Sequence, residues 1–200
     1  YRRVLSLAEH SINFHPSLLP SYRGTAPLIW AIVNGEKETG VTAHQMTEAV
    51  DKGEYYARSF VSIDPNDTGF QLHDKVASQI PPLVSKVVRQ VSDSTLSPIE
   101  SLDLPESIHT SKTNYVNHLD PQNQTKKQIH NIVRALSPPL PPAWLDTPEG
   151  RMEVFSVDCE PSDSEEVIGG VNESVLFHDG SWYIRASDGI IRVIDFSTSQ

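Results

Sequence analysis

Two polar residues with catalytic chemistry, Asn13 and His15, stand two positions apart where a short expected strand at about residues 11–14 runs into a loop. Strand side chains alternate, so both should point to the same face, into the crevice where α/β sheets bind ligands. An imidazole transfers protons near neutral pH, and an amide N–H can hold a developing oxyanion. Asp51, in the turn that ends at Gly53, is the candidate to orient the imidazole.

Asn, His and Asp without a Ser or Cys nucleophile suit direct attack of an amine or water on a carbonyl. The chain shows no phosphate-binding glycine loop and no paired-cysteine motif, and its histidines lack zinc-ligand spacing, so we expect no metal. A structural reading stays open for each residue. His44 would then be satisfied by a backbone carbonyl, Asp51 would shape a turn, and Tyr22 and Arg23 would lie on a loop surface.

Composition narrows the class of protein. The 200 residues are 38% hydrophobic and carry a net charge of −10, which argues against bulk binding of phosphate backbones. Cys159 is the one cysteine, so no disulfide within the chain is possible, and we expect a cytoplasmic, reducing compartment. No run of residues has the length and apolarity of a membrane span, and the first residues lack the apolar core of a signal peptide.

The expected elements of the first half alternate between strands and helices. Thr25 and Pro27 open a helix that Gly35 stops, and strands are expected at 40–46 and 55–63. The apolar positions from Leu72 to Val91 follow a helical period, which Pro81-Pro82 must kink or divide. We expect a partly parallel sheet here. Residues 92–111 are rich in Ser, Asp, Glu and Pro and are typical of a linker.

The second half begins with a helix and then becomes β-rich. A helix is expected at about 124–136, and the prolines at 138–142 end it. Short strands follow from Met152 onward, separated by Asp-Gly turns at 179–180 and 188–189. This pattern favours a small β-barrel or sheet.

The order of the motifs resembles the formyltransferases that use 10-formyltetrahydrofolate. Asn-x-His-x-Ser-Leu-Leu-Pro at 13–20 precedes Arg-Gly at 23–24, Gly-Val-Thr at 40–42 and Asp-x-Gly at 51–53. The segment IHNIVRALSPPLPPAW and the β-rich tail resemble the C-terminal domain of the tRNA and amino-sugar members. The resemblance implies an α/β fold: the C-terminal half of a Rossmann-like catalytic domain (1–106), followed by an OB-like β-barrel domain (107–200).

The resemblance also implies roles for individual residues. Asn13, His15 and Asp51 would be catalytic, and Arg23 and Gly24 would bind the acceptor. The formyl donor, 10-formyltetrahydrofolate, would be held by Ser17, Leu18, Leu19, Pro20, His44, Glu48, Ala49 and Val50.

Family members carry several strands before the Asn-x-His strand, whereas this chain reaches it within a dozen residues of Tyr1. We therefore expect an upstream part of the catalytic domain to be missing. Two further hypotheses follow: hydrolysis of 10-formyltetrahydrofolate by water, against which the β-rich tail argues, and an inactive fragment that binds folate.

The expected acceptor of the formyl group follows from the charge of the second half and from two details of the first half. Residues 107–200 hold 7 Lys and Arg against 13 Asp and Glu, a net charge of −6, whereas a domain that holds tRNA should be locally basic. His44 and the helix end near Trp30 also look more like the amino-sugar members. We expect a nucleotide-linked amino sugar as the acceptor, with methionyl-tRNA as the alternative.

Overall fold

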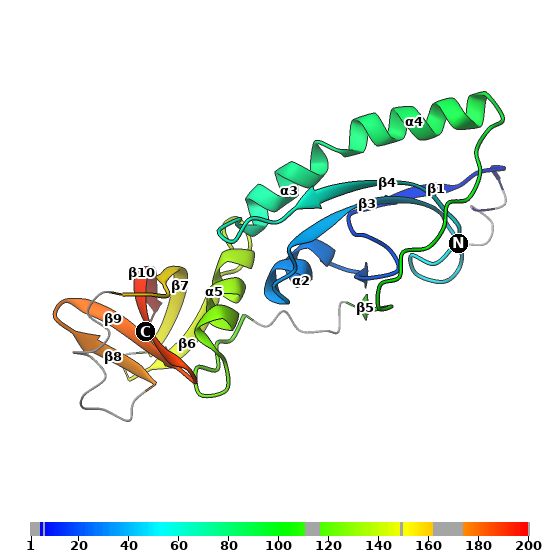
Figure 1. Cartoon of the computed structure of the whole chain (residues 1–200). Helices are drawn as coiled ribbons and strands as arrows, with labels where there is room; N and C mark the ends of the chain where they lie inside the picture. The colour runs from blue at the N-terminus through cyan, green and yellow to red at the C-terminus, as the bar shows by residue number, and fades with distance from the viewer. Residues whose placement is uncertain (1–4, 6, 111–116, 149, 162–173, 200) are drawn as a thin grey trace. The chain divides into compact units, whose positions relative to one another are not determined.

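The computed structural model of the chain describes residues 5, 7–110, 117–148, 150–161 and 174–199. Contacts divide these residues into two compact units. The first takes its described residues from 1–31, 36–65 and 71–114, and the second takes them from 32–35, 66–70 and 115–200. Each unit has its own sheet (Figure 1).

The first unit is built on a three-stranded sheet in the order β1–β3–β4. Its strands are β1 (Ile12–His15), β3 (Glu38–Gln45) and β4 (Tyr55–Ser62). Both pairs are antiparallel, so the expectation of a partly parallel sheet is wrong for these strands. For β3 and β4 the reason is the connection, because residues 46–54 form a short loop, too short for the crossover that parallel strands require.

Three helices accompany this sheet: α2 (Pro27–Val33), α3 (Gly69–Ala77) and α4 (Ile80–Ser92). The expected break at Pro81-Pro82 is confirmed as two helices, with the prolines in the first turn of α4, where their missing N–H groups cost nothing. Helix α4 runs along β3 and β4 (Figure 1) and buries Leu83 and Val87.

A second, very small sheet joins distant parts of the first unit. Strand β2 (Arg23–Gly24) pairs in parallel with β5 (Ile108–His109). Helix α2 begins at Pro27, two residues after Thr25, and the backbone N–H and the hydroxyl of Thr25 both donate to His109 O (2.7 Å and 3.4 Å). The end of the expected linker is therefore hydrogen-bonded structure.

The second unit combines one helix with a five-stranded antiparallel sheet. Helix α5 (Lys126–Ala135) begins with a capping box formed by Thr125 and Gln128, within the expected range. The sheet has the order β6–β7–β10–β9–β8. Its strands are β6 (Ala143–Thr147), β7 (Gly150–Asp158), β8 (Val175–His178), β9 (Ser181–Ala186) and β10 (Gly189–Ser199).

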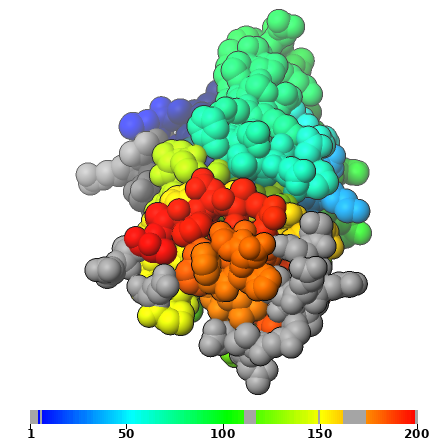
Figure 2. All heavy atoms as spheres, turned by 90° about the vertical axis from the view of Figure 1, so that its left-hand side faces the viewer, coloured from blue at the N-terminus to red at the C-terminus, as the bar shows by residue number. Residues whose placement is uncertain are grey.

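The predicted Asp-Gly turn at 179–180 is confirmed, because His178 pairs with Ser181 across these two residues. The second hairpin turns one residue earlier than predicted, at Ser187-Asp188, because Gly189 is the first residue of β10 and pairs with Ala186. Figure 2 shows the β8–β9 hairpin (orange) and β10 (red) at the surface of this unit. Within the residues that the structure describes, β6 and β8 are edge strands that do not pair with each other, so closure into a barrel stays a prediction.

Candidate active site

The side chains of Asn13 and His15 lie on the same face of β1. Strand β1 pairs with β3 in a register that places Asn13 opposite His44 and His15 opposite Thr42. His15 and His44 are buried, with 4% and 2% of their surface exposed. The side chains of Asn13, His15 and His44 therefore lie close together on one face of strands β1 and β3.

Asp51 connects these three side chains. It follows β3 in a left-handed backbone conformation (φ +47°), and its Oδ2 accepts a hydrogen bond from Gly24 N (2.8 Å). The same oxygen lies 3.5 Å from His15 Nδ1. Its other oxygen, Oδ1, lies 3.5 Å from Asn13 Nδ2 and 3.6 Å from His44 Nε2. One carboxylate thus lies within 3.6 Å of the side chains of Asn13, His15 and His44.

The His15 ring has an acceptor at each nitrogen. Nε2 lies 2.8 Å from the backbone carbonyl of Tyr22, and Nδ1 faces the Asp51 carboxylate. A carbonyl only accepts, so Nε2 carries a proton in this bond. An imidazolium can donate to both partners at once, which suits a group that must hold or give a proton during a reaction.

His44 has the opposite arrangement. Its Nδ1 donates to Gln45 O (3.0 Å), so in the neutral ring Nε2 is an acceptor, and it receives a hydrogen bond from Asn13 Nδ2 (3.2 Å). Burial lowers the pKa of His44 below its ordinary value, against the smaller opposing effects of the Gln45 carbonyl and Asp51. The neutral ring fixes the orientation of the Asn13 amide.

One Asn13 N–H is held by His44, and the second faces Asp51 Oδ1 at the long distance of 3.5 Å. A bond of that length is weak. It can be exchanged for a stronger bond to an oxyanion, which is a better acceptor than a distant carboxylate.

The residues expected to hold the formyl donor fall into two groups. Ser17, Leu18, Leu19 and Pro20 are buried beside Thr42, whose hydroxyl donates to Ser17 O (2.7 Å) and accepts from Leu19 N (3.1 Å). Glu48, Ala49 and Val50 are exposed in the loop before Asp51. The folate-binding roles of both groups stay predictions.

The two residues expected to receive the acceptor are engaged within the chain. Arg23 forms an ion pair with Glu106 (2.9 Å), and only 12% of its side chain is exposed. Gly24 donates its N–H to Asp51 and approaches β5. Sequence reasoning missed the Tyr22 carbonyl, which holds His15, and Ser107, whose hydroxyl accepts from Tyr22 N–H. No spacing signal could have found Ser107, because 85 residues separate it from Tyr22.

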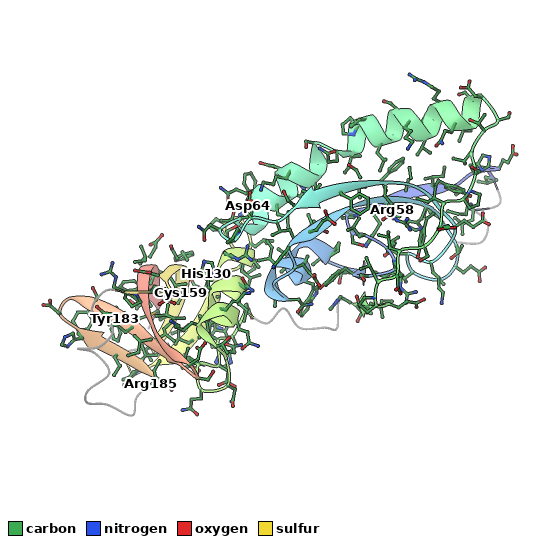
Figure 3. All side chains as sticks on the ribbon, in the orientation of Figure 1. Arg58, Asp64, His130, Cys159, Tyr183 and Arg185 are labelled. Atoms are coloured by element: carbon green, nitrogen blue, oxygen red, sulfur yellow. The ribbon has the colours of Figure 1, made fainter. Side chains whose placement is uncertain are left out.

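A separate pocket of about 490 Å³ lies in the second unit. Its lining comes from α5, the end of β7, the β9–β10 turn and one preceding loop: Asn66, Lys126, Lys127, His130, Val157, Asp158, Cys159, Glu160 and Asp188. Figure 3 labels His130 on α5 and Cys159 at the end of β7. Burial lowers the pKa of His130 and raises that of Cys159, so both are uncharged near neutral pH.

Two further observations bear on the class of protein. Among the residues that the structure describes, no helix is long and apolar enough to cross a membrane. The same residues form no group of three or more His, Cys, Asp or Glu that could hold a metal ion.

Comparison with known proteins supplies the family. The sequence model described as "Formyl transferase" matches residues 2–88, and "Formyl transferase, C-terminal domain" matches residues 117–199. A methionyl-tRNA formyltransferase of Caldanaerobacter subterraneus subsp. tengcongensis is 35% identical over 136 residues, which are 68% of this chain and 44% of that protein.

Solved structures show the same fold at low identity. The N-formyltransferase from Helicobacter canadensis, solved with folinic acid and dTDP-3-aminofucose, superposes with a TM-score of 0.69 at 23% identity, covering 91% of this chain and 65% of that one. HypX from Aquifex aeolicus, solved with tetrahydrofolic acid, gives 0.66 at 19% identity, covering 96% and 32%. The chain thus spans less than two thirds of the length of each of these relatives. With both domain models matched in order, the chain belongs to the formyl transferase family.

Proposed function

We propose that this chain carries the reacting groups for transfer of a formyl group from 10-formyltetrahydrofolate to a primary amine. The observation that carries the proposal is the contact of one carboxylate, Asp51, with Asn13, His15 and His44 on one face of the sheet. A folate as donor is supported by relatives solved with folinic acid and with tetrahydrofolic acid.

In the proposed reaction, the amine nitrogen attacks the formyl carbon and forms a tetrahedral oxyanion. The Asn13 N–H that faces Asp51 Oδ1 turns to the oxyanion and stabilises it together with the protonated His15 ring. Asp51 holds His15 in place and takes part in moving the amine proton. The bond between the formyl carbon and N10 then breaks, N10 receives a proton, and tetrahydrofolate leaves as the amine becomes a formamide.

For the acceptor, we propose a nucleotide-linked amino sugar. The net charge of −6 over residues 107–200 disfavours a domain that binds tRNA through its phosphates. The Helicobacter relative was solved with a dTDP-linked amino sugar. The second candidate is methionyl-tRNA, which the 35% identity to a methionyl-tRNA formyltransferase favours. Closure of the second sheet into an OB-like barrel belongs to the same proposal.

The test is an assay of tetrahydrofolate release by the protein produced from its natural start codon. We expect release to require a dTDP- or UDP-linked amino sugar and to be lost in His15→Ala and Asp51→Ala. The matched control is His73→Ala, because His73 is an exposed residue of α3. If release requires methionyl-tRNA, the acceptor is methionyl-tRNA and not an amino sugar. If release occurs without any amine, the reaction is hydrolysis and not formyl transfer.

A further inference from the structure

The segment at residues 105–110, called the return segment below, is hydrogen-bonded to the loop at residues 21–25. Four of these hydrogen bonds involve a backbone group. They are Ser21 Oγ to Pro105 O (2.6 Å), Tyr22 N to Ser107 Oγ (2.7 Å), Arg23 N to Ser107 O (2.9 Å) and Thr25 N to His109 O (2.7 Å).

The other side of the same loop contacts the site. The Tyr22 carbonyl accepts the hydrogen bond from His15 Nε2 (2.8 Å), and Gly24 N donates to Asp51 Oδ2 (2.8 Å). Loop 21–25 therefore lies between the return segment and two of the three predicted catalytic side chains. Any shift of the loop moves the partners of both.

Tyr22 is the residue through which this connection is most direct. Its backbone is left-handed (φ +59°), an uncommon conformation for a bulky residue. In this conformation its N–H reaches Ser107 Oγ while its carbonyl reaches His15. A sparsely populated conformation of this kind persists only when its surroundings hold it, and the Ser107 hydroxyl is one of the groups that do so.

Side chains hold the return segment against the loop as well. Glu106 pairs with Arg23 (2.9 Å). The ring of His109 stacks on Tyr22 (centroids 5.7 Å apart) and on Trp30 (4.5 Å). These contacts keep the segment in place when a single hydrogen bond is removed, so Ser107 can be tested without detaching the whole segment.

We propose that Ser107 is a positioning residue, which aims the catalytic imidazole of His15 through the backbone of Tyr22. The expected effect of Ser107 on the rate rests on the proposed function. Its expected effect on the position of His15 rests on the geometry alone. Removing the hydroxyl leaves Tyr22 N–H without this partner, and the carbonyl that holds His15 Nε2 is free to move.

The experiment compares Ser107→Ala with Ser107→Thr, which keeps the hydroxyl, and with Ser101→Ala. Ser101 is an exposed serine of the same connection whose hydroxyl bonds to the adjacent Leu102 carbonyl. Each variant is made in the protein produced from its natural start codon. The readouts are kcat, KM for 10-formyltetrahydrofolate, the thermal midpoint, and the rate at which the His15 Nε2 proton exchanges with water in NMR spectra.

In Ser107→Ala we expect kcat to fall about tenfold, the effect of losing one part-buried hydrogen bond, with KM within about twofold of the parent. The His15 Nε2 proton should exchange faster, and Ser107→Thr should restore both values. An unchanged exchange rate in Ser107→Ala overturns the proposal, as does a lower kcat that only follows a lower thermal midpoint. If the parent transfers no formyl group, the proposed function fails, and the exchange rate alone then decides the role of Ser107.

Discussion

His44 Nε2 accepts a hydrogen bond from Asn13 Nδ2 at 3.2 Å, while His44 Nδ1 donates to the adjacent Gln45 carbonyl. The backbone bond decides which ring nitrogen carries the proton, and the ring then decides which way the amide faces. A histidine that sequence reasoning placed among the folate contacts is therefore, in its geometry, the partner of a predicted catalytic amide.

Replacing His44 tests this relationship. In His44→Leu the Asn13 amide loses its acceptor in a buried setting, and we expect kcat to fall about tenfold. His44→Gln offers a carbonyl oxygen of similar reach, so it should retain most of the parent kcat. The measurement is steady-state formyl transfer for both variants. An equal loss of kcat in His44→Leu and His44→Gln would show that the imidazole itself, not the hydrogen bond, is required.

Asp51→Asn separates the charge of Asp51 from its shape. The amide oxygen can still accept from Gly24 N, so the free energy of unfolding should change by less than about 1 kcal/mol. The carboxylate that faces His15 and His44 is lost, and we expect kcat to fall about a hundredfold or more.

The control is Asp64→Asn, which removes an exposed carboxylate paired with Lys75 (2.6 Å). This variant should keep the parent rate, because an exposed ion pair contributes little. Similar rates in Asp51→Asn and Asp64→Asn would contradict a catalytic role for the Asp51 charge.

Stability should fall as the solution becomes acidic. Burial holds the pKa of His44 below 6.5, its value in the unfolded chain, so below pH 6.5 the unfolded chain binds a proton that the folded chain does not. The free energy of unfolding then decreases as pH falls through this window. Burial also lowers the pKa of His109 and His130, with the same sign.

Urea unfolding at about pH 7.5, 6.5 and 5.5 measures this slope. His44→Gln should give a shallower slope than the parent, and the remainder should come from the other two histidines. A parent slope that the substitution leaves unchanged would mean that His44 does not contribute to the pH dependence.

Gly24→Ala should disrupt the contact between β2 and β5. A Cβ at this position would lie 1.9 Å from His109 O, and the backbone has φ +92°, which side chains rarely adopt. We expect a loss of about 2 kcal/mol in stability together with a loss of activity, because Gly24 N also holds Asp51. The measurement is the thermal midpoint beside kcat. Gly180→Ala is the control: φ is +76° there too, but no atom lies within 4 Å.

The local parts of the fold could be predicted from the sequence, because they depend on neighbouring residues. Alternation along β1 placed Asn13 and His15 on one face, and Pro81-Pro82 divided the helical pattern into α3 and α4. Periodicity could not predict strand direction, since it is the same in parallel and antiparallel sheets. The short connection at residues 46–54 was the signal that could have shown β3 and β4 to be antiparallel. The antiparallel order β1–β3–β4 therefore differs from the expected one.

Contacts between residues far apart in the sequence could not be predicted either. Strand β5 has two residues and pairs through backbone groups, which leave no pattern in the side chains. For the same reason the contact of Ser107 with Tyr22 could not be predicted. Asp51 was predicted to orient His15 from its place in the turn after the strand expected at 40–46, whereas the 3.5 Å distance came only from the folded chain.

The pairing of β2 with β5 also determines where a truncated or chimeric protein should be divided. The first family model ends at residue 88, and a truncation or chimera spliced there would leave strand β5 with the other half. The catalytic part would then carry a β2 without its neighbour, next to His15 and Asp51. A chimera that exchanges the C-terminal domain within the family should instead be joined after residue 110. The return segment and the loop at residues 21–25 then stay in the same part of the protein.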